Sequence, residues 1–201
     1  MKRKALALLL IGGAVLLAGC GALPVTVDLL PALQSSGSAS GSLSQPLNLP
    51  PGSELGDLEG KTLWLPDQEG LAVSYEVPAL PAEPASLEFD YAVRLDYAVT
   101  CVDGLRGQAT ASLYLSGESP PWDAPLEGAE ASVALKPEGS LRLEGHTSLT
   151  PEQIDAVLSG KVVLGLRLEF RDLEGTVSES CTPEIEGAYQ IERAVLKIRF
   201  L

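Results

Sequence analysis

Residues 86–101 read Ser86-Leu-Glu-Phe-Asp-Tyr-Ala-Val-Arg-Leu-Asp-Tyr-Ala-Val-Thr-Cys101, and this stretch decides the fold. Every second residue from Leu87 to Cys101 is apolar, and most residues between them are polar or charged. A period of two places one face of a β-strand in a core and the other face in solvent. At about 3.3 Å per residue the run spans roughly 50 Å, so we expect a bend or bulge that lets this strand serve two sheets.

The same alternation recurs along the rest of the chain. It is clear at 71–77, 109–115, 131–135, 162–170 and 194–200. Turn-forming Gly, Pro and Asp residues separate these runs, at 67–70, 103–104, 117–121, 137–139 and 172–175. The sequence therefore predicts an all-β fold, an antiparallel β-sandwich of about seven to nine strands.

One short helix is expected within this pattern, at 151–159. Thr150 is a favourable N-cap, Pro151 suits the first helical position and Gln153 completes a capping box. Gly160 then ends the helix. We expect the helix to act as a lid across one end of the sandwich.

The segment 20–58 has little sustained alternation and includes a Gly/Ser-rich stretch at 34–45. It is predicted to be a disordered tether, with a mean span of roughly 35 Å, before a β-sandwich domain at 59–201. One run within it alternates and could add a strand to a sheet edge: Val25, Val27 and Leu29.

The N-terminus has the organisation of a secretory signal. Lys2, Arg3 and Lys4 precede an uncharged run at 5–17, which is shorter than the roughly 20 apolar residues that cross a bilayer. The run ends in Leu17-Ala18-Gly19-Cys20, which resembles the lipobox of bacterial lipoproteins.

That resemblance implies a signal peptide at 1–19, cleavage before Cys20, and acyl chains on this cysteine. Two or three such chains make a lasting membrane anchor. The expected location is extracytoplasmic and membrane-anchored. Gly21 stands where an Asp often marks inner-membrane retention in this class, which favours the outer membrane or the cell surface.

Two cysteines remain once Cys20 is acylated. Thiols of an exported chain oxidise, so we expect a disulfide between Cys101 and Cys181, with Cys101 on the buried face of its strand. In the chain-entropy description, closing a loop of about 80 residues stabilises the fold by roughly 4.5 kcal/mol.

The charge balance excludes several partners. Without residues 1–19 the chain keeps 11 of its 14 basic residues against 27 acidic ones, a formal charge of −16. This field repels nucleic acid. A glycine-rich run at 56–62 resembles a phosphate-binding loop, but it has three residues between its glycines instead of four, and Asp57 and Glu59 would repel phosphate. We therefore expect neither a nucleic acid nor a nucleotide partner.

No cofactor or reaction centre is predicted. His146, in an expected turn, is the single histidine, which excludes a multi-histidine zinc site, and no Gly-x-Ser-x-Gly motif is present. Calcium has candidate ligands in the expected turns: Asp67, Glu69, Asp103, Asp172 and Glu174. Trp122, in a loop between Pro121 and Asp123, is a candidate binding residue.

The sequence therefore predicts a non-enzymatic, lipid-anchored envelope protein whose β-sandwich binds another protein or stabilises an envelope assembly. An alternative is a carrier of an apolar, lipid-like ligand, with the β-domain as a cup and helix 151–159 as its lid. An envelope hydrolase is the third possibility, and it requires a cleft with convergent carboxylates of perturbed pKa.

Overall fold

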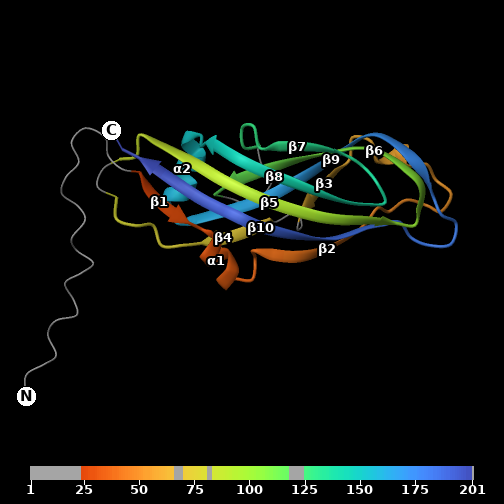
Figure 1. Cartoon of the computed structure of the whole chain (residues 1–201), viewed down its shortest axis with the longest axis horizontal. Coiled ribbons are helices and arrows are strands. Elements are labelled where there is room, and N and C mark those ends of the chain that lie inside the picture. Colours follow the sequence, from red (N-terminus) through yellow and green to blue (C-terminus); the bar gives the residue numbers. More distant parts are fainter. Residues whose placement is uncertain (1–23, 66–69, 81–82, 118–124, 201) are drawn as a thin grey trace, which may run out of the picture.

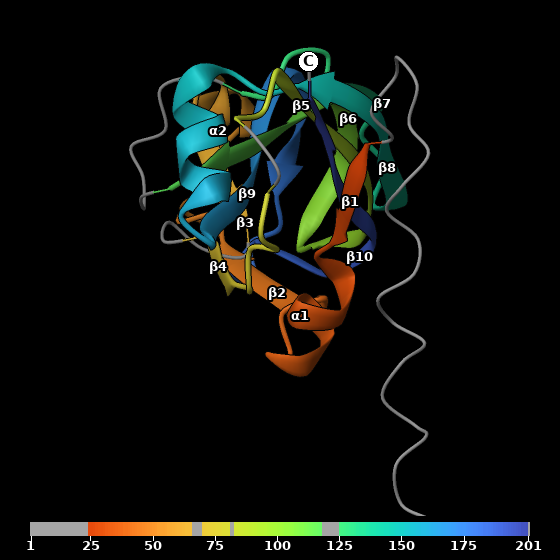
Figure 2. The ribbon, with the colours of Figure 1, turned by 90° about the vertical axis from the view of Figure 1, so that its left-hand side faces the viewer.

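The computed structural model describes residues 24–65, 70–80, 83–117 and 125–200. Within these ranges ten strands form two antiparallel sheets, which pack face to face (Figures 1 and 2). Sheet A contains β1 (Val25–Asp28), β2 (Ser40–Pro46), β5 (Ser86–Thr100), β8 (Glu138–Ser148) and β10 (Glu184–Arg199). Sheet B contains β3 (Thr62–Leu65), β4 (Leu71–Ser74), β6 (Val102–Ser116), β7 (Glu130–Ala134) and β9 (Lys161–Val177). The predicted antiparallel β-sandwich is confirmed.

The strand order is that of a jelly roll. β1 and β2 lie end to end along one edge of β10, and β3 and β4 lie in the same way along β9, so each sheet is four strands wide. The pairing is nested, because the first strands pair with β10, the next with β9, β5 with β8, and β6 with β7. A jelly roll has eight strand positions that pair in this nested order and are divided between two sheets.

The two ends of the sandwich differ in their connections. At one end β5 passes into β6 through Cys101 alone, and residues 178–183 join β9 to β10. We call this the disulfide end. At the opposite end, the β1 end, β1 begins beside the end of β10 and the start of β5 (Figure 1).

β5 does not serve two sheets, as its length led us to expect. It pairs with β10 from Ser86 to Thr100, and the irregularity lies on β10, between Ile191 and Arg193. The chain changes sheets after β5, at Cys101, which has φ of 60° and is half-buried. The prediction that Cys101 lies on the buried face of a strand is therefore wrong, because the residue forms the turn itself.

Tyrosine rings fill space beside glycines in sheet A. In three cross-strand pairs, a Cβ atom added to the glycine would lie within 3 Å of the tyrosine side chain. The pairs are Tyr91 with Gly145, Tyr97 with Gly139, and Tyr189 with Gly41. Glycine at these positions therefore leaves the space that each tyrosine side chain occupies.

The predicted helix is confirmed as α2 (Pro151–Leu158), with its capping box. The Thr150 backbone N–H donates to Gln153 Oε1 at 2.9 Å. The Tyr75 hydroxyl donates to the Val157 carbonyl at 2.6 Å, and Val157 is 1% exposed. The helix packs against β6 and β9 at the β1 end (Figure 2). In the ranges that the structure describes, no helix is long and apolar enough to cross a membrane.

The predicted tether is wrong from Val25 onward. β1 confirms the alternating run at 25–29, and β2 pairs with β10 over seven residues. Between them, α1 (Leu30–Ser35) buries Leu33 completely. The short helix η1 (Leu55–Leu58) packs on β9 and leaves Leu55 1% exposed. The folded domain therefore includes β1, α1, β2 and η1 and does not begin at residue 59.

The composition of β2 explains the error. Its serines Ser40, Ser42 and Ser44 point to solvent, while Gly41 faces the core beneath Tyr189 and Leu43 is 6% exposed. The strand has a period of two, but small residues hide it, and the sequence looks like a flexible Gly/Ser linker.

Candidate functional site

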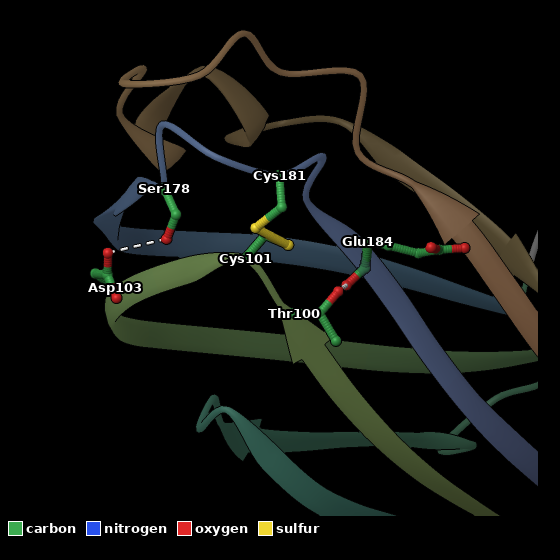
Figure 3. Close-up of a disulfide and its surroundings, with 6 residues drawn as sticks. All are labelled: Thr100, Cys101, Asp103, Ser178, Cys181 and Glu184. Atoms are coloured by element: carbon green, nitrogen blue, oxygen red, sulfur yellow. Dashed lines mark hydrogen bonds between the residues drawn. A yellow bond between two sulfur atoms is a disulfide. The ribbon is translucent and has the colours of Figure 1, made fainter.

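The disulfide joins two of the connections between the sheets, the β5–β6 turn and residues 178–183. Cys101 and Cys181 are bonded, with Cα atoms 5.8 Å apart (Figure 3). Near the bridge the Ser178 hydroxyl donates to the Asp103 carboxylate at 2.9 Å. The predicted pairing is confirmed. Cys181 is exposed, so the bridge joins surface turns and is not part of the core.

Four of the predicted site residues lie outside the described residues: Cys20, Asp67, Glu69 and Trp122. The remaining calcium candidates do not form a ligand set. Glu174 lies opposite Arg106 in the sheet register, and Asp103 accepts the bond from Ser178. Asp172 has φ of 52° where the pairing of β6 and β9 is irregular. The described part of the chain holds no group of three or more His, Cys, Asp or Glu residues able to bind a metal ion.

The outer face of sheet A has a broad, open hollow toward the disulfide end, with a volume of about 880 Å³. The sheet register gives eight outward positions on this part of the face, in two rows across four strands; seven line the hollow, and Ser140 lies beside it, opposite Asp96. One row is Ser44, Glu186, Ala98 and Glu138, and the next is Ser42, Ala188, Asp96 and Ser140. We call these eight residues the acidic hollow. Sequence analysis missed them because the small residues of β2 hid its strand and 138–148 was not recognised as a strand.

Side-chain size and charge give the acidic hollow its character. Five of its eight residues are Ser or Ala, and the other three are the carboxylates Asp96, Glu138 and Glu186. Arg94, in the next row, donates to Asp96 at 3.0 Å. The bonds from Arg94 and Ser140 lower the pKa of Asp96. The hollow therefore presents negative charge above a floor of small side chains.

A second hollow of about 630 Å³ lies on the same face nearer the β1 end, but its charges are largely matched. Lys197 pairs with Asp90 at 2.5 Å, and Arg199 pairs with Glu88 at 3.1 Å just beyond it. His146, expected in a turn, lies within β8 opposite Asp90. Cross-strand ion pairs such as these are the ordinary pattern of a solvent-facing sheet.

An aromatic cluster lies on the outer face of sheet B. The Trp64 and Tyr114 rings are 5.0 Å apart, and the Arg167 guanidinium lies 5.9 Å and 5.1 Å from their centroids. Arg167 also pairs with Glu169 at 2.8 Å. Tyr114 is 1% exposed, and burial raises its pKa. These contacts are those of a packed cluster and not of an open platform for a ligand.

The space between the sheets is small. Two cavities, lined almost entirely by apolar side chains, have volumes of about 30 and 20 Å³. A ligand-sized pocket has roughly 300–1,000 Å³. In the described residues, the inner faces of the two sheets pack against each other.

No protein-family model matches the chain, and no curated protein sequence matches it. Among solved structures, the chain is similar to a chain in the structure of deformed wing virus carrying the GFP gene, at 13% identity and a TM-score of 0.36. This match covers 97% of the chain but 56% of the viral one. A marine algae virus of the order Picornavirales gives 9% identity and a TM-score of 0.32 over 86% of this chain and 70% of that chain.

Proposed function

We propose that the protein is a lipid-anchored cell-envelope protein, non-enzymatic, whose jelly roll binds another protein. The lipobox at 17–20 supports the anchor, since the acyl chains of a lipoprotein cysteine hold it stably in a membrane. The disulfide supports an extracytoplasmic location, because such bonds persist in oxidising compartments. The favoured membrane is the outer membrane, or the cell surface.

The acidic hollow carries the proposal of a protein partner. It is the larger of the two hollows described on sheet A, and its carboxylates Glu138 and Glu186 complement a Lys- or Arg-rich segment. A field of this sign steers a cationic partner toward the face and discriminates against anionic ones. The small cavities between the sheets favour binding on the outside over the alternative of an apolar ligand carried inside.

Site-specific cross-linking in the native envelope tests this function. A photoreactive amino acid replaces Ala188, an exposed residue of the hollow, and in a matched variant it replaces Ala134, an exposed residue of β7 on sheet B. We expect one defined protein adduct at 188 and none at 134. Identical adducts at both positions, or none at either, contradict the proposal.

The identified partner then allows a direct measurement. Glu138→Gln with Glu186→Gln should weaken its binding to the purified protein, and added salt should weaken the wild-type complex in the same direction. Binding that is insensitive to both changes would show that the carboxylates do not recognise the partner.

The anchor is tested separately with Cys20→Ser. Mass spectrometry of the wild-type protein should find a mature chain that begins at Cys20 and carries acyl groups. The variant should be neither acylated nor processed normally. A wild-type N-terminus elsewhere, without acyl mass, would overturn both the anchor and the location.

A further inference from the structure

The first described strand lies close in sequence to the residue that carries the lipid. β1 starts at Val25, five residues after Cys20. A fully extended chain covers at most about 3.6 Å per residue, so their Cα atoms are separated by no more than about 18 Å. This bound is about half the span expected for a flexible tether of 20–58.

The bilayer uses part of this reach. The hydrocarbon core is about 30 Å thick and the whole bilayer about 40–45 Å, which leaves roughly 5–8 Å of headgroups on each side. Acyl chains in the hydrocarbon hold Cys20 near the inner boundary of the headgroups. Val25 must then lie within roughly 10–13 Å of the outer headgroup surface.

The topology brings other segments to the same end as Val25. Val25 pairs with Ile198, and the Ala85 N–H donates to the Arg199 carbonyl at 2.8 Å. The connection from β4 to β5 therefore reaches the β1 end, as Figure 2 shows when the molecule is viewed from this end.

This connection contains an uncharged run at 77–80, Val77-Pro78-Ala79-Leu80. Pro78 and Ala79 are exposed, while Leu80 is partly buried and packs against the core. The run therefore exposes a small apolar surface, Pro78 and Ala79, and Leu80 holds this surface on the sandwich.

We propose that the run at 77–80 docks on the lipid headgroup surface, so that the jelly roll stands on its β1 end. This inference rests on the lipid anchor of the proposed function. The short reach from Cys20 keeps the β1 end at the membrane. The apolar run gives this end an uncharged surface, so its contact with the bilayer interface costs little desolvation free energy.

The position of the acidic hollow favours the same orientation. Standing on the β1 end leaves the acidic hollow open to a partner. A sandwich lying on sheet A would instead press carboxylates against the membrane.

Fluorescence quenching by lipids tests the orientation. The full lipidated chain carries a maleimide fluorophore at Ala79→Cys or, as the matched control, at Ala134→Cys; both alanines are exposed. Each protein is reconstituted in phosphatidylethanolamine–phosphatidylglycerol vesicles that contain a lipid with a nitroxide headgroup. We expect loss of fluorescence at position 79 and none at 134. Glu83→Cys, in the same connection, should behave like position 79.

The outcomes separate the two proposals. The acyl mass of the protein is verified first. If quenching at positions 79 and 83 is then no stronger than at 134, the docking is overturned and the anchor stays intact. An unmodified Cys20 in the wild-type protein overturns the anchor and the docking together.

Discussion

Leu43→Ala should destabilise the protein strongly, because this leucine belongs to a strand of the sandwich. Leu43 is 6% exposed and lines an apolar cavity of about 20 Å³ together with Leu95 and Ile185. The substitution removes buried methyl groups and enlarges a space that already exists, so the surroundings cannot easily collapse into it. For such a site we expect a loss of about 3–4 kcal/mol in the free energy of unfolding.

Denaturant unfolding of the chain from Gly21 onward, with the disulfide intact, measures this loss. The midpoint should fall while the slope with denaturant stays unchanged. Ser42→Ala, at the exposed neighbouring position of β2, is the control and should change stability by less than about 0.5 kcal/mol. If Leu43→Ala also changes stability by less than about 0.5 kcal/mol, β2 is not docked on β10 and the segment behaves as a tether after all.

Three further predictions concern packing, the disulfide and pH. Gly139→Ala should cost about 1–3 kcal/mol in denaturant unfolding because the new methyl meets a tyrosine ring, whereas Gly56→Ala, which meets nothing within 4 Å, should be nearly neutral. Serine at both Cys101 and Cys181 should lower stability by up to about 4.5 kcal/mol, measured against the oxidised wild type. Burial raises the pKa of Tyr75 from 10.0 to about 12, so the unfolded chain loses this proton first and stability should fall between those pH values. Tyr75→Phe should remove this part of the alkaline loss.

The long strands could be predicted from the sequence because their two faces differ strongly in polarity. β5, with Phe89 and Leu95 toward the core and Glu88 and Asp96 toward solvent, is the clearest case. The helix α2 could be predicted as well, since its capping box and its proline act locally. The cysteine pair could be predicted because the N-terminal pattern predicts export, and two thiols remain once Cys20 is set aside.

The docked N-terminal segment and the acidic hollow could not be predicted in the same way. The strand character of β2 depends on a tyrosine of β10 that lies over Gly41, and no local pattern contains that contact. The hollow depends on the register of four strands, which brings Ser44, Glu186, Ala98 and Glu138 into one row. Such a row is set by tertiary pairing between distant parts of the chain.

The nested pairing of the jelly roll has a consequence for how the chain can fold. β10 is the last of the described strands along the chain, yet β1, β2 and one edge of β5 all pair with it. Contacts between residues so far apart, such as Val25 with Ile198, impose a large loop-closure cost and slow folding. In a nascent chain that lacks residues 184–199, β5 can pair with β8, but β1, β2 and the other edge of β5 have no native partner until those residues are made.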